Sequence, residues 1–349
     1  MSPHKILILQ TAFLGDVVLT LPLVQVLHRR FPDAQIDFLT TPKGAEVLRN
    51  HPAIHSIIEY DKRGSQRGVG AMISLARRLR GERYDVALVP HRSLRTALII
   101  ALSRIPKRVG FNTSAGAILF STRIKYRKDS HEVERNLSFL KVFDVEHRER
   151  EYPALYPAPA DAAAVDAFLN ENDIKPDEKI VAIAPGSVWN TKRWLPERFA
   201  EVARRLSAGG VKVVLVGGKE DADLCSEIAG GPERKGIIVA AGTFTILQSA
   251  ELLERCSAIV TNDTAPMHLA VAMGTPVVAI FGATVPSFGF GPYNEQDVVV
   301  QTEGLPCRPC SIHGGDRCPI GTFVCMKNIE AETVYQRAIQ MLQNRPPKT

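Results

Sequence analysis

The stretch Asn262-Asp-Thr-Ala-Pro-Met-His-Leu-Ala-Val-Ala-Met-Gly-Thr-Pro-Val-Val-Ala-Ile-Phe-Gly282 decides the predicted fold of this chain. It follows the apolar run 258–260, which is typical of a buried strand. Its first three residues favour a turn and a helix N-cap. Pro266 suits the first helical turn, and Gly274 suits the position just past a helix end. With the apolar run 276–281, the pattern predicts a strand–helix–strand unit of a parallel sheet.

Polar side chains lie in the predicted strand-to-helix turn. Ligands of open parallel sheets bind at the carboxyl ends of the strands, and the start of a helix offers free N–H groups and a partial positive charge that suit a phosphate. Asp263 could accept hydrogen bonds from hydroxyl groups, and His268 could donate one to an oxyanion. Their spacing is equally compatible with a simpler arrangement, in which Asp263 only caps the helix and His268 packs against the sheet.

Length and composition indicate a two-domain globular protein. A chain of 349 residues exceeds one ordinary core. The net charge of +6 and pI of about 9.0 favour acidic partners, such as a nucleotide, a phosphorylated lipid, an anionic membrane face or nucleic acid. Nucleic acid ranks low because aromatic residues are only 7% and the basic residues are dispersed.

No apolar run approaches the ~20 residues that span a bilayer, so we expect a cytoplasmic protein, with transient contact at the cytoplasmic face of the inner membrane.

Strands and helices are predicted to alternate twice along the chain. This pattern is typical of an α/β protein with two Rossmann-like, doubly wound domains and a cleft between them. The Pro- and Ala-rich segment 154–159 marks the boundary, which gives domains 1–155 and 156–349. One continuous helix is expected over residues 17–30. The final helix, residues 330–343, could pack back on the first domain.

Three further loops carry residues that suit chemistry. Gly15 permits close approach after the first strand, and Asp16 could be a general base or only a helix-end charge. Ser187 and Lys192 follow the first strand of the second domain and could bind a diphosphate. The pattern is not a Walker loop, so ATP hydrolysis is not expected. Glu220 follows two glycines after a strand, where it could bind ribose hydroxyls or form a polar turn.

Four segments occur in an order that resembles the family-9 glycosyltransferases, the lipopolysaccharide heptosyltransferases, and among them the heptosyltransferase II type. They are Leu9-Gln-Thr-Ala-Phe-Leu-Gly-Asp-Val-Val-Leu-Thr-Leu-Pro22, Pro90-His-Arg-Ser-Leu-Arg95, Ala184-Pro-Gly-Ser187 with Lys192-Arg-Trp194, and Asn262-Asp-Thr-Ala-Pro-Met-His268. The resemblance spans residues 4–343. It implies the GT-B architecture and an inverting transfer without metal or cofactor. It also implies ADP-L-glycero-D-manno-heptose as the donor and the Kdo- or heptose-bearing inner core on lipid A as the acceptor.

The resemblance assigns roles residue by residue. Asp16 matches the proposed catalytic base, and Lys192 matches the lysine that neutralises the donor diphosphate. The donor-binding set also includes Gly15, Ser187, Glu220 at the ribose, Phe244 and Thr245 near the adenine, and Asp263, Thr264, Ala265 and His268 at the diphosphate and sugar. Contacts with the acceptor are expected from Arg63, Arg92, Arg95 and Arg123, although isolated surface arginines are common.

The chain departs from the family pattern at two places. The family often has Gly where this chain has Ala265, and Thr-Asp-Pro where it has Thr284-Val-Pro286. The second change removes a carboxylate near the sugar, so a GT-B transferase for another nucleotide sugar, or a sugar-nucleotide epimerase, remains the alternative. Cys307, Cys310, Cys318 and Cys325 could bind a structural metal or stay as reduced thiols; neither is expected to take part in the transfer.

Overall fold

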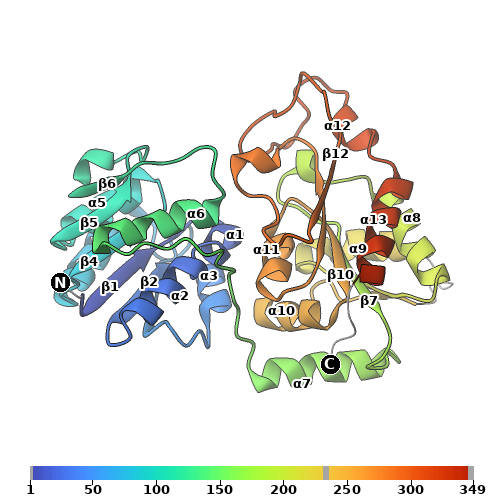
Figure 1. The fold of residues 1–349 in the computed structure, drawn as a ribbon, viewed down its shortest axis with the longest axis horizontal. Helices are drawn as coiled ribbons and strands as arrows, with labels where there is room; N and C mark the ends of the chain where they lie inside the picture. Colours follow the sequence, from blue (N-terminus) through green and yellow to red (C-terminus); the bar gives the residue numbers. More distant parts are fainter. Residues whose placement is uncertain (1–2, 231–235, 345–349) are drawn as a thin grey trace. The chain divides into compact units, whose positions relative to one another are not determined.

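The chain folds into two compact α/β units, Met1–Tyr156 and Pro157–Thr349. The computed structural model describes residues 3–230 and 236–344. The division between the units falls within the segment 154–159 that the sequence singles out, whereas the predicted outer limits at residues 1 and 349 lie outside the described residues. In each unit a parallel sheet is covered by helices (Figure 1).

The first unit is built on a six-stranded sheet with the strand order β3-β2-β1-β4-β5-β6, in which all pairings are parallel. Its strands are β1 (Lys5–Leu9), β2 (Gln35–Thr40), β3 (Ser56–Glu59), β4 (Val86–Val89), β5 (Lys107–Phe111) and β6 (Thr122–Ile124). Its helices are α1 (Leu14–Val18), α2 (Leu21–Arg30), α3 (Pro42–Leu48), α4 (Gly68–Gly81), α5 (Leu94–Leu102) and α6 (Glu132–Leu137), with 3₁₀ turns η1 (Ala117–Leu119) and η2 (Ser138–Phe143).

The second unit repeats this arrangement with the order β12-β11-β10-β7-β8-β9, again all parallel. Its strands are β7 (Ile180–Ala184), β8 (Lys212–Leu215), β9 (Ile237–Val239), β10 (Ala258–Asn262), β11 (Val277–Phe281) and β12 (Val298–Gln301). Its helices are α7 (Pro159–Glu171), α8 (Pro196–Ala208), α9 (Ala222–Ala229), α10 (Ile246–Arg255), α11 (Ala265–Ala272), α12 (Val324–Lys327) and α13 (Ala331–Asn344), with 3₁₀ turns η3 (Asn190–Lys192), η4 (Lys219–Asp221) and η5 (Pro286–Phe288).

The two strand orders share one topology. Counted along the chain within its own unit, each sheet has the order 3-2-1-4-5-6, in which the direction of winding reverses between the first and fourth strands. The reversal lies between β1 and β4 in the first unit and between β7 and β10 in the second. Loops that follow these four strands therefore meet in pairs at the carboxyl edge of each sheet, where open α/β sheets bind ligands.

The expected single helix over residues 17–30 is wrong. The structure has α1 and α2 in its place, with a break at Leu19 and Thr20. Pro22 lacks an N–H group and cannot continue a helix that began earlier, but it is accommodated in the first turn of a new one. The hydroxyl of Thr20 donates to the carbonyl of Asp16 at 2.7 Å and holds the turn between the helices.

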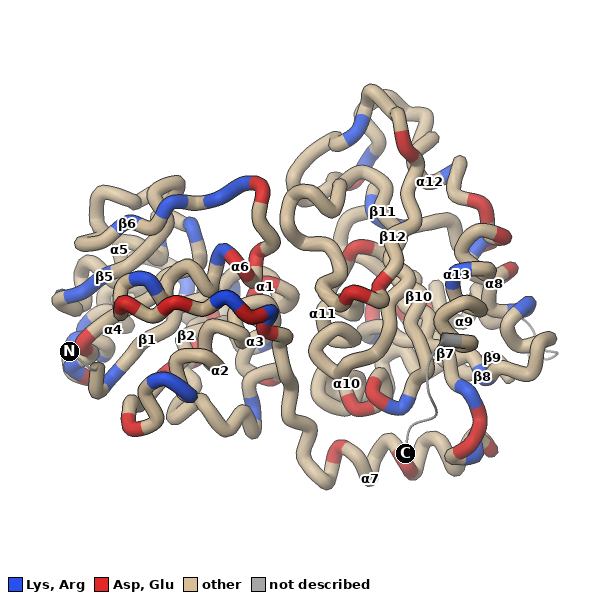
Figure 2. The backbone as a smooth tube through the Cα atoms, viewed as in Figure 1, with Lys and Arg blue, Asp and Glu red and all other residues tan. Residues whose placement is uncertain are grey.

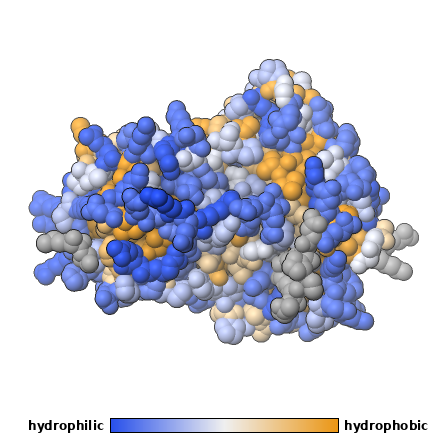
Figure 3. Space-filling model, viewed as in Figure 1, coloured by the Kyte–Doolittle hydropathy of each residue, from blue (hydrophilic) through white to orange (hydrophobic). Residues whose placement is uncertain are grey.

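Charged residues of both signs are distributed over both units (Figure 2). Hydrophilic residues cover most of the face seen in Figure 3, with separate hydrophobic areas on each unit. Within residues 3–230 and 236–344, no helix combines the length and the apolar character needed to cross a bilayer.

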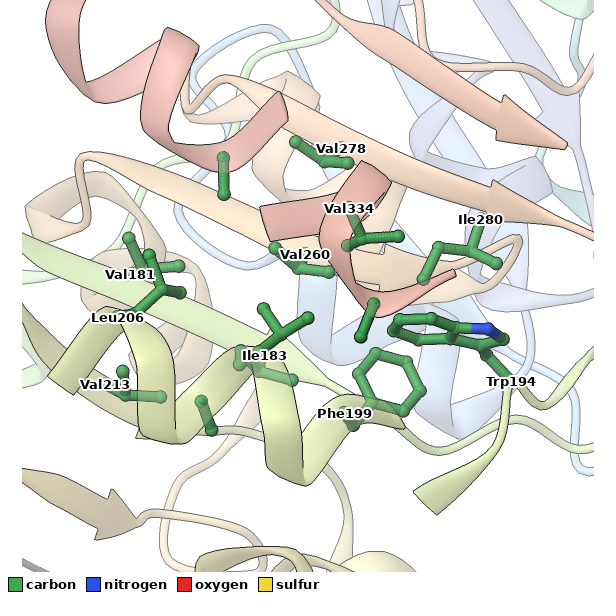
Figure 4. Packing of buried hydrophobic residues seen from close by; sticks show 14 of the residues in the cluster. Val181, Ile183, Trp194, Phe199, Leu206, Val213, Val260, Val278, Ile280 and Val334 are labelled. Carbon is green, nitrogen blue, oxygen red and sulfur yellow. The ribbon is translucent and has the colours of Figure 1, made fainter. Parts of the chain in front are cut away.

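The core of the second unit lies between its sheet and helices α8 and α13. Val181, Ile183 and Val260 from the sheet pack with Trp194, Phe199, Leu206 and Val334, as Figure 4 shows. The Trp194 and Phe199 rings meet edge to face at 4.9 Å. Sequence analysis allowed the final helix α13 to pack on the first domain. In the structure, it buries Val334 and Ala338 in this core and contacts α8 and β10.

One buried amide joins three segments of the second unit. Asn262, at the end of β10, is fully buried. Its Nδ2 donates to the carbonyl of Pro185 at 2.7 Å, and its Oδ1 accepts from the N–H of Trp194 at 3.0 Å. The loop between β7 and α8, which contains Ser187 and Lys192, is therefore held at both ends against the carboxyl end of β10.

We predict that Asn262→Ala destabilises the second unit by about 2–4 kcal/mol, because it leaves a buried carbonyl and a buried N–H without partners. Urea unfolding followed by tryptophan fluorescence measures this, since both tryptophans, Trp189 and Trp194, lie in this unit. Asn190→Ala, at an exposed asparagine of the same loop, is the control and should change stability by less than about 0.5 kcal/mol. Equal effects of the two substitutions would contradict the role of the Asn262 amide.

Candidate active site

An ion pair between Lys192 and Asp263 connects the two loops at the winding reversal of the second unit. The Lys192 ammonium lies 2.7 Å from Asp263 Oδ2 and donates to the Asp263 carbonyl at 3.3 Å. Thr284 donates its hydroxyl to the same Oδ2 at 2.6 Å. Both charged side chains are largely buried, with 14% and 7% of their surfaces exposed. The pair is therefore only weakly screened by water, and it places a cation at the start of helix α11.

His268 lies beneath this pair as a neutral imidazole. It is on α11 and only 6% exposed. Burial lowers the pKa of His268 to about 4; the negative charge of Asp263 opposes this shift and the positive charge of Lys192 adds to it. Its Nδ1 has no hydrogen-bond partner within the described part of the chain. A neutral ring of this kind can donate or accept one hydrogen bond but adds no charge at neutral pH.

The remaining donor-side residues divide into two groups. Ser187 lies on the loop after β7, where its Oγ accepts from the N–H of Trp189 at 3.4 Å, and Thr264 and Ala265 begin α11. In the sequence, Ser187 lies shortly before Lys192, and Thr264 and Ala265 follow Asp263 directly. Glu220 is exposed on η4, after β8.

Phe244 and Thr245 are already engaged within the second unit. The Phe244 ring packs edge to face on Phe168 of α7 at 5.0 Å. The Thr245 hydroxyl caps α10 by accepting from the N–H of Gln248 at 3.3 Å, and the Gln248 side chain accepts in return from the N–H of Thr245 at 3.1 Å. Any contact of these residues with a nucleotide would have to be made around these interactions.

Sequence analysis missed Asp221, which brings the η4 loop against the β7 loop. A Cβ added to Gly186 or Gly217 would overlap the Asp221 side chain, so both positions require glycine for close approach. Asp221 Oδ2 accepts from the N–H of Gly218 at 3.0 Å, and burial raises the pKa of this carboxyl. Gly186 and Gly217, which each follow a strand, were the sequence signal that could have indicated this close approach.

In the first unit, Asp16 is half-buried at the third position of α1, one residue after the buried Gly15. Its Oδ2 accepts from the N–H of Phe13 at 3.1 Å, which is the one half of a capping box that a phenylalanine N-cap allows. This contact is the one expected of a helix-end charge.

The loops after β1 and β4 are joined by side chains that sequence analysis did not single out. His91 Nδ1 lies 3.0 Å from Thr11 Oγ1 and 2.9 Å from Thr96 Oγ1. The ammonium of Lys62 donates to the Thr11 carbonyl at 2.6 Å. Burial lowers the pKa of His91 to about 4, with Lys62 acting in the same direction.

Two of the four predicted acceptor arginines lie together. Arg63 and Arg95 line a hollow of about 670 Å³ with Lys62, Arg67 and Gly68. Arg92 instead lies over the ring of Tyr126, with its Cζ 4.3 Å from the ring centroid. Arg123 is exposed on β6. The hollow is thus a site of concentrated positive charge on the first unit.

All six cysteines are free thiols. Burial raises the pKa values of Cys310 and Cys325, whereas hydrogen bonds from backbone N–H groups, above all that of Phe323, lower the pKa of Cys318. Among the described residues, no group of three or more His, Cys, Asp or Glu side chains is arranged to hold a metal ion.

Two doubly wound units, each with polar loops at its winding reversal, form an α/β fold of the GT-B architecture. Residues 72–315 match the sequence profile of Glycosyltransferase family 9 (heptosyltransferase). This is more than half of the 349 residues, and the chain belongs to glycosyltransferase family 9.

Individual relatives agree with this assignment. The chain is 28% identical to lipooligosaccharide heptosyltransferase 2 of Haemophilus influenzae over 81% of this chain and 85% of the relative. It is similar to the structure of the Escherichia coli ADP-heptose LPS heptosyltransferase II, with a TM-score of 0.79 and 25% identity over 97% and 98% of the two chains. A family-9 glycosyltransferase from Veillonella parvula shares the fold with a TM-score of 0.88 and 24% identity, over 98% of each chain.

We predict that His268 makes the second unit sensitive to acid. Because its pKa is lower in the folded chain than the ordinary 6.5, the unfolded chain binds a proton that the folded chain does not, and stability falls as pH drops from about 6.5 to 4. The contribution is about 3 kcal/mol. In urea titrations followed by tryptophan fluorescence, His268→Gln should flatten this pH dependence, whereas substitution of the exposed His4 should not. An unchanged pH dependence in the His268 variant would contradict the prediction.

Proposed function

We propose that this chain is an inverting heptosyltransferase, which moves a heptose from ADP-L-glycero-D-manno-heptose to the inner core of lipopolysaccharide, on a Kdo- or heptose-bearing lipid A acceptor. The observation that carries the proposal is the buried Lys192–Asp263 pair at the start of α11 in a family-9 chain. The similarity to the Escherichia coli enzyme, which is described as an ADP-heptose transferase, supports the choice of donor.

Lys192 is suited to the leaving group. As the sugar–phosphate bond breaks, negative charge develops on the departing ADP, and a fixed ammonium and the N–H groups at a helix start stabilise such charge. Asp263, whose carboxylate accepts from the Thr284 hydroxyl, holds the ammonium in place until the diphosphate binds. The Asp263 carboxylate can then accept hydrogen bonds from sugar hydroxyls, and neutral His268 can donate one.

Asp16 is suited to the acceptor. In inverting transfer, the acceptor hydroxyl attacks the anomeric carbon while its proton passes to a base. We assign the base to Asp16, so that the first unit supplies the proton acceptor and the second supplies the diphosphate site. Every step uses side chains of this chain, and the proposal includes no metal or cofactor.

The cationic hollow of the first unit supports a phosphorylated lipid acceptor. Lys62, Arg63, Arg67 and Arg95 gather positive charge there. Val69 and Leu94, neighbours of these residues in the chain, are 65% and 49% exposed. Cations beside exposed apolar side chains suit an anionic membrane surface, so we place the reaction at the cytoplasmic face of the inner membrane. No nucleic-acid partner is proposed.

The donor assignment predicts that Lys192→Ala weakens ADP-heptose binding and lowers turnover together. An ammonium on the diphosphate acts in both the ground state and the transition state, and losing a desolvated charged contact costs about 2–4 kcal/mol of transition-state stabilisation. Calorimetry and steady-state rates of ADP release measure the two effects. Lys327→Ala, at an exposed lysine of the same unit, should leave both unchanged. An unaltered kcat/KM for Lys192→Ala would remove this residue from the site.

The base assignment predicts that Asp16→Asn lowers turnover by roughly 10²–10⁴-fold and leaves donor affinity nearly unchanged. The matched control is Asp161→Asn, because Asp161 occupies the same capping position in α7 and accepts from the N–H of Ala158 at 2.8 Å. If Asp16 is only a helix-end charge, both variants should lose a little thermal stability and keep their turnover. Rates with ADP-heptose and truncated core acceptors distinguish the two cases.

A further inference from the structure

A buried carboxylate and a buried guanidinium lie together on α6 in the first unit. Glu132 is 5% exposed and Arg135 is 2% exposed. Arg135 Nη1 donates to Glu132 Oε2 at 2.9 Å, while its Nε and Nη2 donate to the carbonyls of Arg127 and Lys128 at 2.7 and 2.8 Å. This network fixes the position of the Glu132 carboxylate, and neither role assigned above uses it.

The ring of Tyr126 completes the group. The Cζ atoms of Arg92 and Arg135 lie 4.3 and 4.5 Å from its centroid. We refer to Glu132, Arg135, Tyr126 and Arg92 as the Glu132 cluster. Its two guanidinium groups are held on one aromatic ring, a geometry that arginine favours.

The cluster is attached directly to the turn that carries Asp16. Asn136, fully buried on α6, donates through Nδ2 to the Leu19 carbonyl at 2.9 Å. The same Nδ2 lies 3.4 Å from the hydroxyl of Thr20, which in turn donates to the Asp16 carbonyl at 2.7 Å. Glu132 lies one helical turn before Asn136, and Asp16 lies one turn before Thr20. The two carboxylates therefore lie on neighbouring turns, and the charge of Asp16 acts on Glu132.

The charges around Glu132 come from three elements. Asp16 faces it from α1, Arg92 from the loop after β4, and Arg135 from α6 itself. Burial, followed by the negative charge of Asp16, raises the pKa of Glu132 to about 7, against the opposing effect of the two arginines. The pKa of Tyr126 is raised by burial, so its hydroxyl remains neutral. Glu132 thus changes its charge near neutral pH.

We propose that Glu132 is a positioning residue for the transfer reaction: its negative charge makes Asp16 a stronger base, while Asn136 of the same helix holds the turn that follows Asp16. This inference rests on the proposed role of Asp16. A nearby negative charge disfavours a carboxylate relative to its protonated form, and a base that holds a proton more tightly removes one from a hydroxyl more readily. The proton of the acceptor passes to Asp16, and Glu132 does not touch the reacting atoms.

The first test needs no substrate. Infrared titration of the full-length protein follows the carboxylic acid C=O band, and subtraction of the Glu132→Gln spectrum isolates the band of Glu132. We expect a midpoint near pH 7 in the wild-type protein, and a midpoint at lower pH in Asp16→Asn, because that variant removes the neighbouring charge but leaves Glu132 in place. Glu134→Gln, the control on the same helix, should keep the wild-type midpoint. A midpoint that Asp16→Asn does not move would overturn the proposal.

The second test follows the reaction. In the wild-type protein, kcat/KM should fall as pH drops through about 7, because Glu132 takes up a proton. In Glu132→Gln this fall should disappear, and kcat/KM at pH 8 should be roughly 3- to 10-fold lower with donor affinity unchanged. A Glu132→Gln variant that keeps the fall, and loses only thermal stability, would show a merely structural residue. Absence of any heptose transfer by the wild-type protein would instead reject the proposed function, independently of the infrared result.

Discussion

The donor side of this protein depends on the buried amide of Asn262. An amide in the interior must satisfy both its N–H and its carbonyl groups, and here it does so only if the end of β7, the beginning of α8 and the end of β10 meet at one point. That constraint brings Lys192 to Asp263. The ion pair is thus a consequence of a neutral hydrogen-bonded core rather than its cause, in agreement with the small net stability that buried ion pairs provide.

The buried pair also constrains how a diphosphate can bind. Lys192 is already neutralised by Asp263, and His268 adds no positive charge at neutral pH because burial keeps it unprotonated. The diphosphate of a donor must therefore share the Lys192 ammonium with Asp263 or replace Asp263 as its partner. Thr284, whose hydroxyl is bonded to the same carboxylate, can keep Asp263 partly satisfied when the ammonium turns towards phosphate. Val285 is the residue that differs from the family pattern. Its neighbour Thr284 therefore takes part in balancing the charges of Lys192 and Asp263.

Sequence patterns predicted those secondary-structure elements that neighbouring residues in the chain determine. The strand–turn–helix around Asn262 is confirmed, because its strand is fully buried and begins with an apolar run, and its turn and proline chemistry leave few alternatives. The short strands β6 and β12 were missed; each lies at a sheet edge and pairs with one neighbour. The break at Pro22 was missed because the apolar periodicity continues across it, although proline itself was the signal.

The site residues that were missed share a different cause. The grouping of Glu132, Arg135 and Tyr126 near Asp16 arises only from the folded arrangement of the chain. The same is true of the contact between Asp221 and Gly186. In the sequence, Glu132 is one of two glutamates in a charged helix, and burial alone distinguishes it from Glu134. No spacing rule predicts which of two such neighbours faces the interior of a short helix that has less than two turns of pattern to offer.

The two units share one topology but carry different charged groups. In each, a side-chain hydrogen bond joins the loops after the first and fourth strands: Thr11 to His91 in the first unit, and Asn262 to Pro185 in the second. Beyond that shared bond, the first unit has the carboxylates of Asp16 and Glu132 in the first turns of α1 and α6, whereas the second has the Lys192–Asp263 ion pair. A carboxylate at a helix start loses basicity to the helix dipole, so a base placed there needs a second negative charge to recover it. Glu132 supplies that charge, and Arg135 makes its burial tolerable.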